Sequence, residues 1–195
     1  MAEFRLRMED AVNAIGISGS LNSPSRAAAL AEHVLAQLSA VHGARTEIIK
    51  LIELAEDLAR SFDQKHVPDA IRGILAKLDR ADVLVIASPI YKASYTGLLK
   101  CFFDLIDPKL LTGKVAILAG SGGSPLHAIT LEHQFRPLAS FFRMWTVPTT
   151  IYALDNDFVR ISDGYEIVAL DVLSRIATAT KEAMLLKRAD AVVLA

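Results

Sequence analysis

The stretch Val12–Arg26, "VNAIGISGSLNSPSR", joins a short apolar run to a loop rich in hydroxyl groups. The run Val12–Ser18 has the length and composition of a strand that is buried on both faces, as in a parallel sheet. An alanine-rich helical pattern follows the loop directly. A strand, a polar loop and a helix in this order predict the first unit of a parallel α/β fold.

Similar units follow along the chain. "DVLVIAS" from Asp82 and "KVAILAG" from Lys114 predict two more buried strands, which end in the loops "SPIYKASY" and "GSGGSP". The polar run "ARTEIIKL" predicts an edge strand, and "VPTTIYAL" predicts a fifth strand. Helical patterns cover about 25–41, 68–80, 94–106 and 164–188.

Five strands alternating with helices predict a three-layer α/β/α fold around a five-stranded parallel sheet of order 2-1-3-4-5. Ligands bind such sheets beyond the carboxyl ends of the strands. The loops after strands one, three and four should therefore meet at one site. We expect a single domain over residues 1–195, with 1–10 as a disordered N-terminal extension.

Composition excludes several classes of protein. A net charge of −1 over 195 residues leaves no basic footprint for nucleic acid, and no apolar run is long enough to cross a membrane. We expect a cytoplasmic protein with neither partner. Cys101 lies among large apolar residues and is expected to be buried and inert. The five histidines have no metal-ligand spacing, so no metal is predicted.

The first loop offers many hydrogen-bond donors beside a helix N-terminus. Ser20, Asn22, Ser23 and Ser25 precede Arg26, and such a group suits a phosphate monoester. The alternative is that Ser25 only caps the helix. The loop lacks the Gly-Lys-Ser/Thr of a P-loop and the G-x-G-x-x-G of dinucleotide sites. A mononucleotide phosphate fits it better than either.

The other two loops complete a flavin-like site. Pro89 and Tyr91 give a rigid turn with an aromatic wall. Gly120, Gly122 and Gly123 allow a flat ligand to approach the backbone. Plain turn chemistry explains either loop alone. Together with the phosphate loop, they predict a site for flavin mononucleotide (FMN).

These loops carry a family resemblance over about residues 12–180. "GSLNSPSR", "SPIYKASYTGLLK" and "GSGGSP" resemble, in this order, the motifs of the NAD(P)H-dependent FMN reductases, which have a flavodoxin-like fold. The chain is most similar to the FMN reductases of two-component alkanesulfonate monooxygenase systems. The stretch 127–137, "HAITLEHQFRP", resembles the methanesulfonate branch in particular.

The resemblance implies a role for each matching position. Phosphate would be held by the first loop, the ribityl chain and ring edge by the second, and the isoalloxazine by the third. Many relatives have an arginine where Asn22 stands, so the phosphate charge would rest mainly on Arg26 and FMN would be weakly held. The implied residues are Ser20, Asn22, Ser25, Arg26, Pro89, Ile90, Tyr91, Lys92, Gly120, Ser121, Gly122 and Gly123.

The implied reaction is hydride transfer from NADH or NADPH to FMN, with release of reduced FMN to an FMNH2-dependent monooxygenase. The flavin supplies this chemistry, so no catalytic acid or base is expected, and Lys92 is expected to favour two-electron reduction. One alternative is a quinone, azo or metal-ion reductase that retains FMN. A flavodoxin-type electron carrier is another.

The segment 130–142, "TLEHQFRPLASFF", has helical periodicity but contains Pro137. Proline cannot donate a hydrogen bond to the carbonyl of His133. The resemblance implies a one-residue insertion here, at His133, that makes a π-bulge and packs across a tetramer interface. We expect His133 to regulate flavin exchange and packing of a homotetramer. The alternative is that Pro137 merely kinks the helix.

Overall fold

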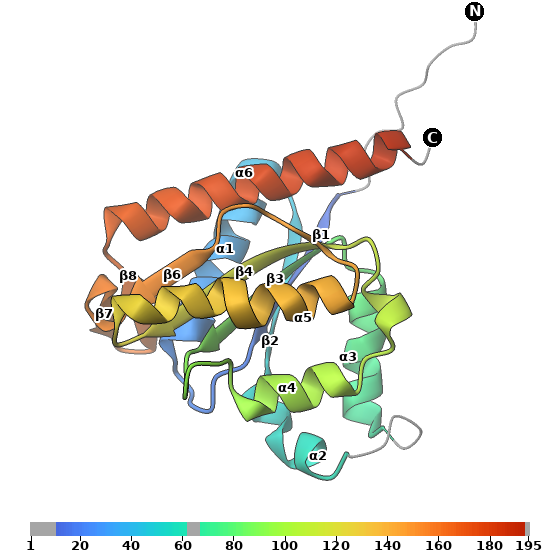
Figure 1. The fold of residues 1–195 in the computed structure, drawn as a ribbon, viewed down its shortest axis with the longest axis horizontal. Coiled ribbons are helices and arrows are strands. Elements are labelled where there is room, and N and C mark those ends of the chain that lie inside the picture. Colours follow the sequence, from blue (N-terminus) through green and yellow to red (C-terminus); the bar gives the residue numbers. More distant parts are fainter. Residues whose placement is uncertain (1–10, 62–66, 194–195) are drawn as a thin grey trace, which may run out of the picture.

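The computed structural model describes residues 11–61 and 67–193, so the expected extension at 1–10 lies outside the described residues. One parallel sheet has the order β2-β1-β3-β4-β5, and β6 also pairs with β4 (Figure 1). The predicted order is therefore confirmed, with the polar strand β2 at an edge. The strands are β1 (Asn13–Ser18), β2 (Arg45–Lys50), β3 (Val83–Pro89), β4 (Val115–Gly122), β5 (Trp145–Thr146) and β6 (Ile151–Leu154).

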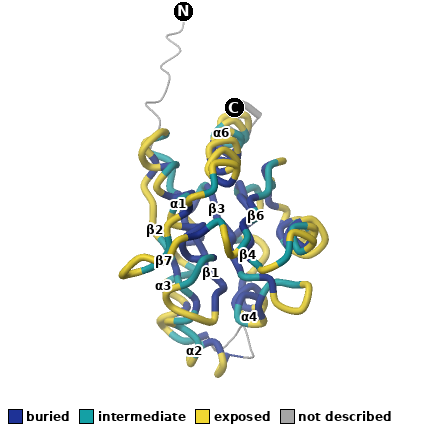
Figure 2. The backbone as a smooth tube through the Cα atoms, turned by 90° about the vertical axis from the view of Figure 1, so that its left-hand side faces the viewer, coloured by how far each residue is buried: buried dark blue, intermediate teal, exposed yellow. Residues whose placement is uncertain are grey.

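Helices cover both faces of the sheet (Figure 1). Val85 and Ile117 point to the face covered by α1 (Arg26–His42) and α6 (Leu170–Val193). The neighbouring residues of the same strands point the other way, because side chains alternate along a strand. That second face is covered by α3 (Asp69–Asp79), α4 (Gly97–Asp104) and α5 (Arg136–Phe141). Figure 2 shows the result as buried strands between helices with exposed outer sides.

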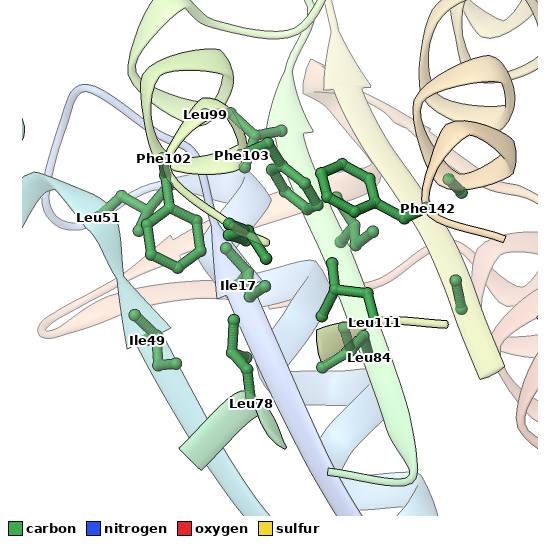
Figure 3. Packing of buried hydrophobic residues seen from close by; sticks show 14 of the residues in the cluster. Ile17, Ile49, Leu51, Leu78, Leu84, Leu99, Phe102, Phe103, Leu111 and Phe142 are labelled. Carbon is green, nitrogen blue, oxygen red and sulfur yellow. The ribbon is translucent and has the colours of Figure 1, made fainter. Parts of the chain in front are cut away.

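The core under α4 and α5 is built on aromatic rings (Figure 3). Phe102 and Phe103 from α4 are buried, and the Phe103 ring lies edge-to-face with that of Phe142, 5.6 Å between centroids. Cys101 was expected to share this core, which is wrong. Its side chain is exposed, because the helix turns residue 101 to the face opposite its buried neighbours.

The chain after β4 differs most from the prediction. The fifth strand consists of two short pieces, β5 and β6, which both pair with β4. The final helix begins at Leu170, and not at 164, because residues 164–167 form β8 (Gly164–Ile167). β8 pairs antiparallel with β7 (Phe158–Ile161). The hairpin was missed because Ile167 also fits the helical spacing of the apolar residues that follow.

The helix that contains proline does carry the predicted bulge. Leu131–Phe135 form a π-helix, and the N–H of Arg136 donates to the carbonyl of Leu131, five residues back. α5 follows immediately, with Pro137 in its first turn. The wide turn thus ends where proline could not have continued the usual hydrogen bonds.

Two short helices precede α3. They are a 3-10 turn at Leu51–Leu54 and α2 (Ala55–Ala59). No helix within residues 11–61 and 67–193 is long and apolar enough to cross a membrane.

Candidate FMN site

The carboxyl ends of β1, β3 and β4 are held side by side by backbone hydrogen bonds that continue past the strands. The N–H of Gly19 donates to the carbonyl of Ala87 over 2.8 Å. The N–H of Ile90 donates to the carbonyl of Ser121, also over 2.8 Å. The three predicted loops therefore start from one rigid edge of the sheet.

Thr96, the N-cap of α4, connects the first two loops. Its hydroxyl donates to the carbonyl of Gly19 over 2.5 Å and accepts from the N–H of Leu99 over 3.1 Å. Its own N–H donates to the hydroxyl of Ser88 over 3.2 Å. Thr96 and Ser88 are both buried, so these bonds are shielded from water and fix the spacing of the loops.

A hollow of about 200 Å³ opens where the loops meet. It collects residues from all three of them, as the sequence predicted. A residue from the unpredicted hairpin, Tyr165, completes its wall. The lining residues are Ser20, Asn22, Pro24, Ser25, Arg26, Ala27, Pro89, Tyr91, Ser121 and Tyr165.

Two serines of the first loop combine a structural role with a free hydroxyl hydrogen. Ser25 Oγ caps α1 by accepting from the N–H of Ala28 over 3.0 Å, and Ser20 Oγ accepts from the N–H of Asn22 over 3.1 Å. Among the described residues, neither hydroxyl donates to a protein acceptor. Capping and phosphate binding are thus compatible, since one uses the oxygen and the other the hydrogen.

Arg26 is the charged residue among those lining the hollow. One of its terminal nitrogens lies 3.2 Å from a carboxylate oxygen of Asp155. Its Nε is buried and has no hydrogen-bond partner within the described part of the chain. Together with the serine hydroxyls, this guanidinium makes a donor set that fits a phosphate group.

The second loop holds its backbone in an uncommon conformation. Lys92 and Ala93 have φ of 51° and 62°, and Tyr91 and Ser94 on either side exchange two backbone hydrogen bonds of 2.9 and 3.1 Å. Positive φ at both central residues defines a type I′ turn, which glycine or asparagine usually occupies. The turn presents Tyr91 at the hollow, with 43% of its surface exposed.

Two glycines of the third loop, Gly120 and Gly122, lie where the protein leaves little or no room for a side chain. A Cβ on Gly122 would lie 2.7 Å from the hydroxyl of Tyr152, and one on Gly120 would lie 3.2 Å from Leu131. Both directions lead into the protein. Ser121, between them on the strand, faces the hollow instead. Gly123 is exposed, and a Cβ on it would make only an ordinary contact, 3.7 Å from a carboxylate oxygen of Asp155.

Some implied residues lie outside the hollow. The side chain of Ile90 is buried against Gly120, so it packs in the protein interior beneath the loops and does not line the hollow. Lys92 is exposed on the turn, and His133 is exposed on the π-helix. The turn reaches that helix, because the hydroxyl of Ser94 donates to Oε1 of Gln134 over 3.4 Å.

Sequence reasoning missed the contribution of the segment after β6. Asp155 and Tyr165 contact Arg26 but lie far from it in sequence. The Asp-Gly pair at 163–164 is a hairpin signal that could have revealed β7 and β8. Nothing in the sequence alone indicates that this hairpin packs beside the first loop. Among the described residues, no group of three His, Cys, Asp or Glu side chains is placed to hold a metal ion.

Comparison with known proteins identifies the family of this chain. Residues 12–159 match the family model of the NADPH-dependent FMN reductases, and the chain belongs to this family. It is 37% identical to an FMN reductase (NADPH) of Pseudomonas aeruginosa, over 87% of this chain and 89% of that protein. It is 36% identical to the NADH-dependent FMN reductase SfnF of Pseudomonas fluorescens, over 90% and 92%.

A solved structure shows the same architecture. The apo form of the NADH:FMN oxidoreductase EmoB superposes with a TM-score of 0.77 at 31% identity, covering 90% of this chain and 89% of that one.

Proposed function

We propose that this FMN reductase releases its reduced FMN to a partner monooxygenase that acts on sulfonates. As a member of its family, the chain is an oxidoreductase that uses FMN and NAD(P)H. FMN accepts hydride from the pyridine nucleotide when it is bound. The protein's part is to bind the phosphate, orient the ring and leave one face open to the hydride donor.

The observation that carries this proposal is the hollow shared by the three loops. It is lined by Ser20, Ser25 and Arg26, whose donors suit a phosphate, and also by Tyr91 and Ser121. We propose that the first group binds the FMN phosphate, and that the second pair borders the ribityl chain and ring. Lys92 and Gly123, both exposed beside it, would contact the ring edge.

The sulfonate partner rests on two supports. The stretch 127–137 carries the pattern of the methanesulfonate branch, and its predicted π-helix is present at Leu131–Phe135. One relative is an NADH-dependent FMN reductase named SfnF. We further propose that His133 and this helix pack against second copies of the chain in a homotetramer. Large apolar side chains are exposed beside it, at Leu126, Ile129 and Phe141.

Retention of FMN tests the proposal. The protein is loaded with one equivalent of FMN, reduced anaerobically with NADH or NADPH, and passed through an ultrafilter. We expect reduced FMN in the filtrate. We also expect a sulfonate monooxygenase to need less added flavin for turnover when the two proteins are mixed. FMN that stays with the protein, with an azo dye or quinone reduced without added FMN, would establish the retained-flavin alternative.

Deletion of His133 tests the role of the π-helix. We expect the mass in solution or the retention of FMN to change, because the wide turn would close to an α-helical one. If the deletion variant keeps the mass and FMN retention of the wild type, His133 has no regulatory role.

A further inference from the structure

Arg26 is held by two residues from the segment that follows β6. Asp155 forms an ion pair with it at 3.2 Å, and the two side chains are 37% and 50% exposed. The ring of Tyr165 lies under its guanidinium, 5.1 Å from the ring centroid to the guanidinium carbon. The position of Arg26 at the hollow is therefore set by residues outside the first loop.

Tyr165 is itself fixed by the hairpin. It lies directly opposite Arg160 in the β7–β8 pairing, and the Arg160 guanidinium carbon is 4.9 Å from its ring centroid. The ring also contacts Phe158 edge-to-face at 6.3 Å. An aromatic ring flanked by two cations attracts both, so Tyr165 keeps Arg26 beside the hollow independently of Asp155.

The ion pair has a consequence for any anion that enters the hollow. Arg26 supplies the positive charge among the lining residues, and Asp155 already compensates it. A phosphate dianion must displace the carboxylate or share the guanidinium with it. Either way, the negative charge of Asp155 opposes phosphate binding, since like charges in one partly buried site repel.

We propose that Asp155 lowers the affinity of the site for the FMN phosphate, and that Tyr165 positions Arg26 to receive that phosphate. The inference rests on the proposed FMN site. It explains ready release of FMN from that site by the charge of Asp155. Asp155 acts as a competitor for Arg26, and Tyr165 is a positioning residue.

The test compares FMN with riboflavin, which has the same ring but no phosphate. For Asp155→Asn we expect FMN to bind about three- to tenfold more tightly by flavin fluorescence, with riboflavin changed less than twofold. Asp163→Asn is the matched control, because it removes the same charge from the exposed hairpin turn near the first loop, where Asp163 forms no ion pair with Arg26 among the described residues. Unchanged FMN affinity in Asp155→Asn, or an equal gain in Asp163→Asn, would overturn the role of Asp155.

Two variants test Tyr165. Tyr165→Phe keeps the ring and should retain the FMN affinity, whereas Tyr165→Leu should weaken FMN binding at least threefold and leave riboflavin binding within twofold. Equal losses for FMN and riboflavin in Tyr165→Leu would mean that Tyr165 only supports the fold.

Inorganic phosphate gives a readout without flavin. It should raise the melting temperature of Asp155→Asn more than that of the wild type, relative to chloride at equal ionic strength. If the wild type binds neither flavin, the FMN site itself is wrong and the inference fails with it. If the wild type binds FMN, but Asp155→Asn has the FMN affinity and the phosphate-induced shift in melting temperature of the wild type, only the inference fails.

Discussion

The rings of Tyr95 and Phe135 meet edge-to-face, with centroids 5.4 Å apart and planes at 83°. Tyr95 follows the turn at Tyr91–Ser94, and Phe135 is the last residue of the π-helix. The ring pair therefore joins the loop beside the hollow to the irregular helix. A change in the packing of the π-helix can therefore shift the loop Tyr91–Ser94 through this contact.

Replacing Phe135 with leucine should weaken this link. Phe135 is buried, and loss of an aromatic pair costs about 0.5–1.5 kcal/mol beyond the change in buried area. We expect a lower free energy of unfolding in urea and weaker FMN binding. Tyr95→Phe retains the ring pair and is the control. If Phe135→Leu loses stability but binds FMN as tightly as the wild type, the ring pair does not couple the helix to the site.

Ser25 offers a variant that separates capping from phosphate binding. Aspartate is as good an N-cap as serine, so Ser25→Asp should keep the stability of the wild type. Its negative charge would face the phosphate, and FMN binding should fall at least tenfold. Ser25→Ala should instead lose about 1 kcal/mol of stability with the cap. Tight FMN binding by Ser25→Asp would remove Ser25 from the site.

The turn after β3 contains a correctable strain. Ala93 has a φ of 62°, where a Cβ costs roughly 1 kcal/mol. Ala93→Gly should therefore raise the free energy of unfolding by about 0.5 kcal/mol, after the added entropy of the unfolded chain. Ala36→Gly, on the exposed side of α1, is the control and should lose up to about 1 kcal/mol. Similar losses in both variants would contradict the strained turn.

Gly122 is expected to tolerate no side chain while Tyr152 keeps its hydroxyl. The hydroxyl donates to the carbonyl of Ser124 over 2.7 Å, and a Cβ on Gly122 would lie 2.7 Å from it. Gly122→Ala should lower the melting temperature, and adding Tyr152→Phe should restore part of the loss. Gly123→Ala is the control, since its Cβ would make only an ordinary contact at 3.7 Å. If Tyr152→Phe does not raise the melting temperature of Gly122→Ala, the Tyr152 hydroxyl is not what the added Cβ meets.

The π-helix should contribute a pH-dependent part of the stability. Hydrogen bonds from Arg136, one of them 2.5 Å long, lower the pKa of the Glu132 carboxyl below its usual 4.5. A lowered folded-state pKa means that the pair stabilises fully above the unfolded pKa, and that this stabilisation is lost as pH falls through the folded value.

Glu132→Gln tests this pair. Because the side chains are 41% and 26% exposed, we expect a loss of only about 0.5–1 kcal/mol at pH 7. The difference from the wild type in urea unfolding should shrink when the pH is lowered from 7 to 3. A difference that is equal at both pH values would show that the carboxylate charge is not involved.

The sequence predicted the parallel sheet because its central strands are buried on both faces and carry uninterrupted apolar runs, as at Val83–Ala87. It predicted the three loops because each is short and follows its strand directly. The π-helix at Leu131–Phe135 was expected from the family resemblance, and Pro137 supplied its physical reason, because proline cannot donate the next hydrogen bond of the helix. These features depend on residues that are neighbours along the chain.

The remaining features depend on contacts between distant segments. The Arg26–Asp155 pair spans most of the chain, and no local pattern places the β7–β8 hairpin beside the first loop. That a Cβ on Gly122 would meet the hydroxyl of Tyr152 from β6 also depends on such a contact, and no local pattern indicates it. The exposure of Cys101 was missed because apolar neighbours on a helix do not by themselves define which side is buried.

The most direct test of the FMN site is steady-state oxidation of NADH and NADPH, followed at 340 nm as a function of FMN concentration. We expect saturable, FMN-dependent oxidation by the wild type, and a KM for FMN at least tenfold higher in Ser25→Asp at unchanged stability. A folded wild type that oxidises neither donor in the presence of FMN, or a Ser25→Asp variant with the wild-type KM, would contradict the account.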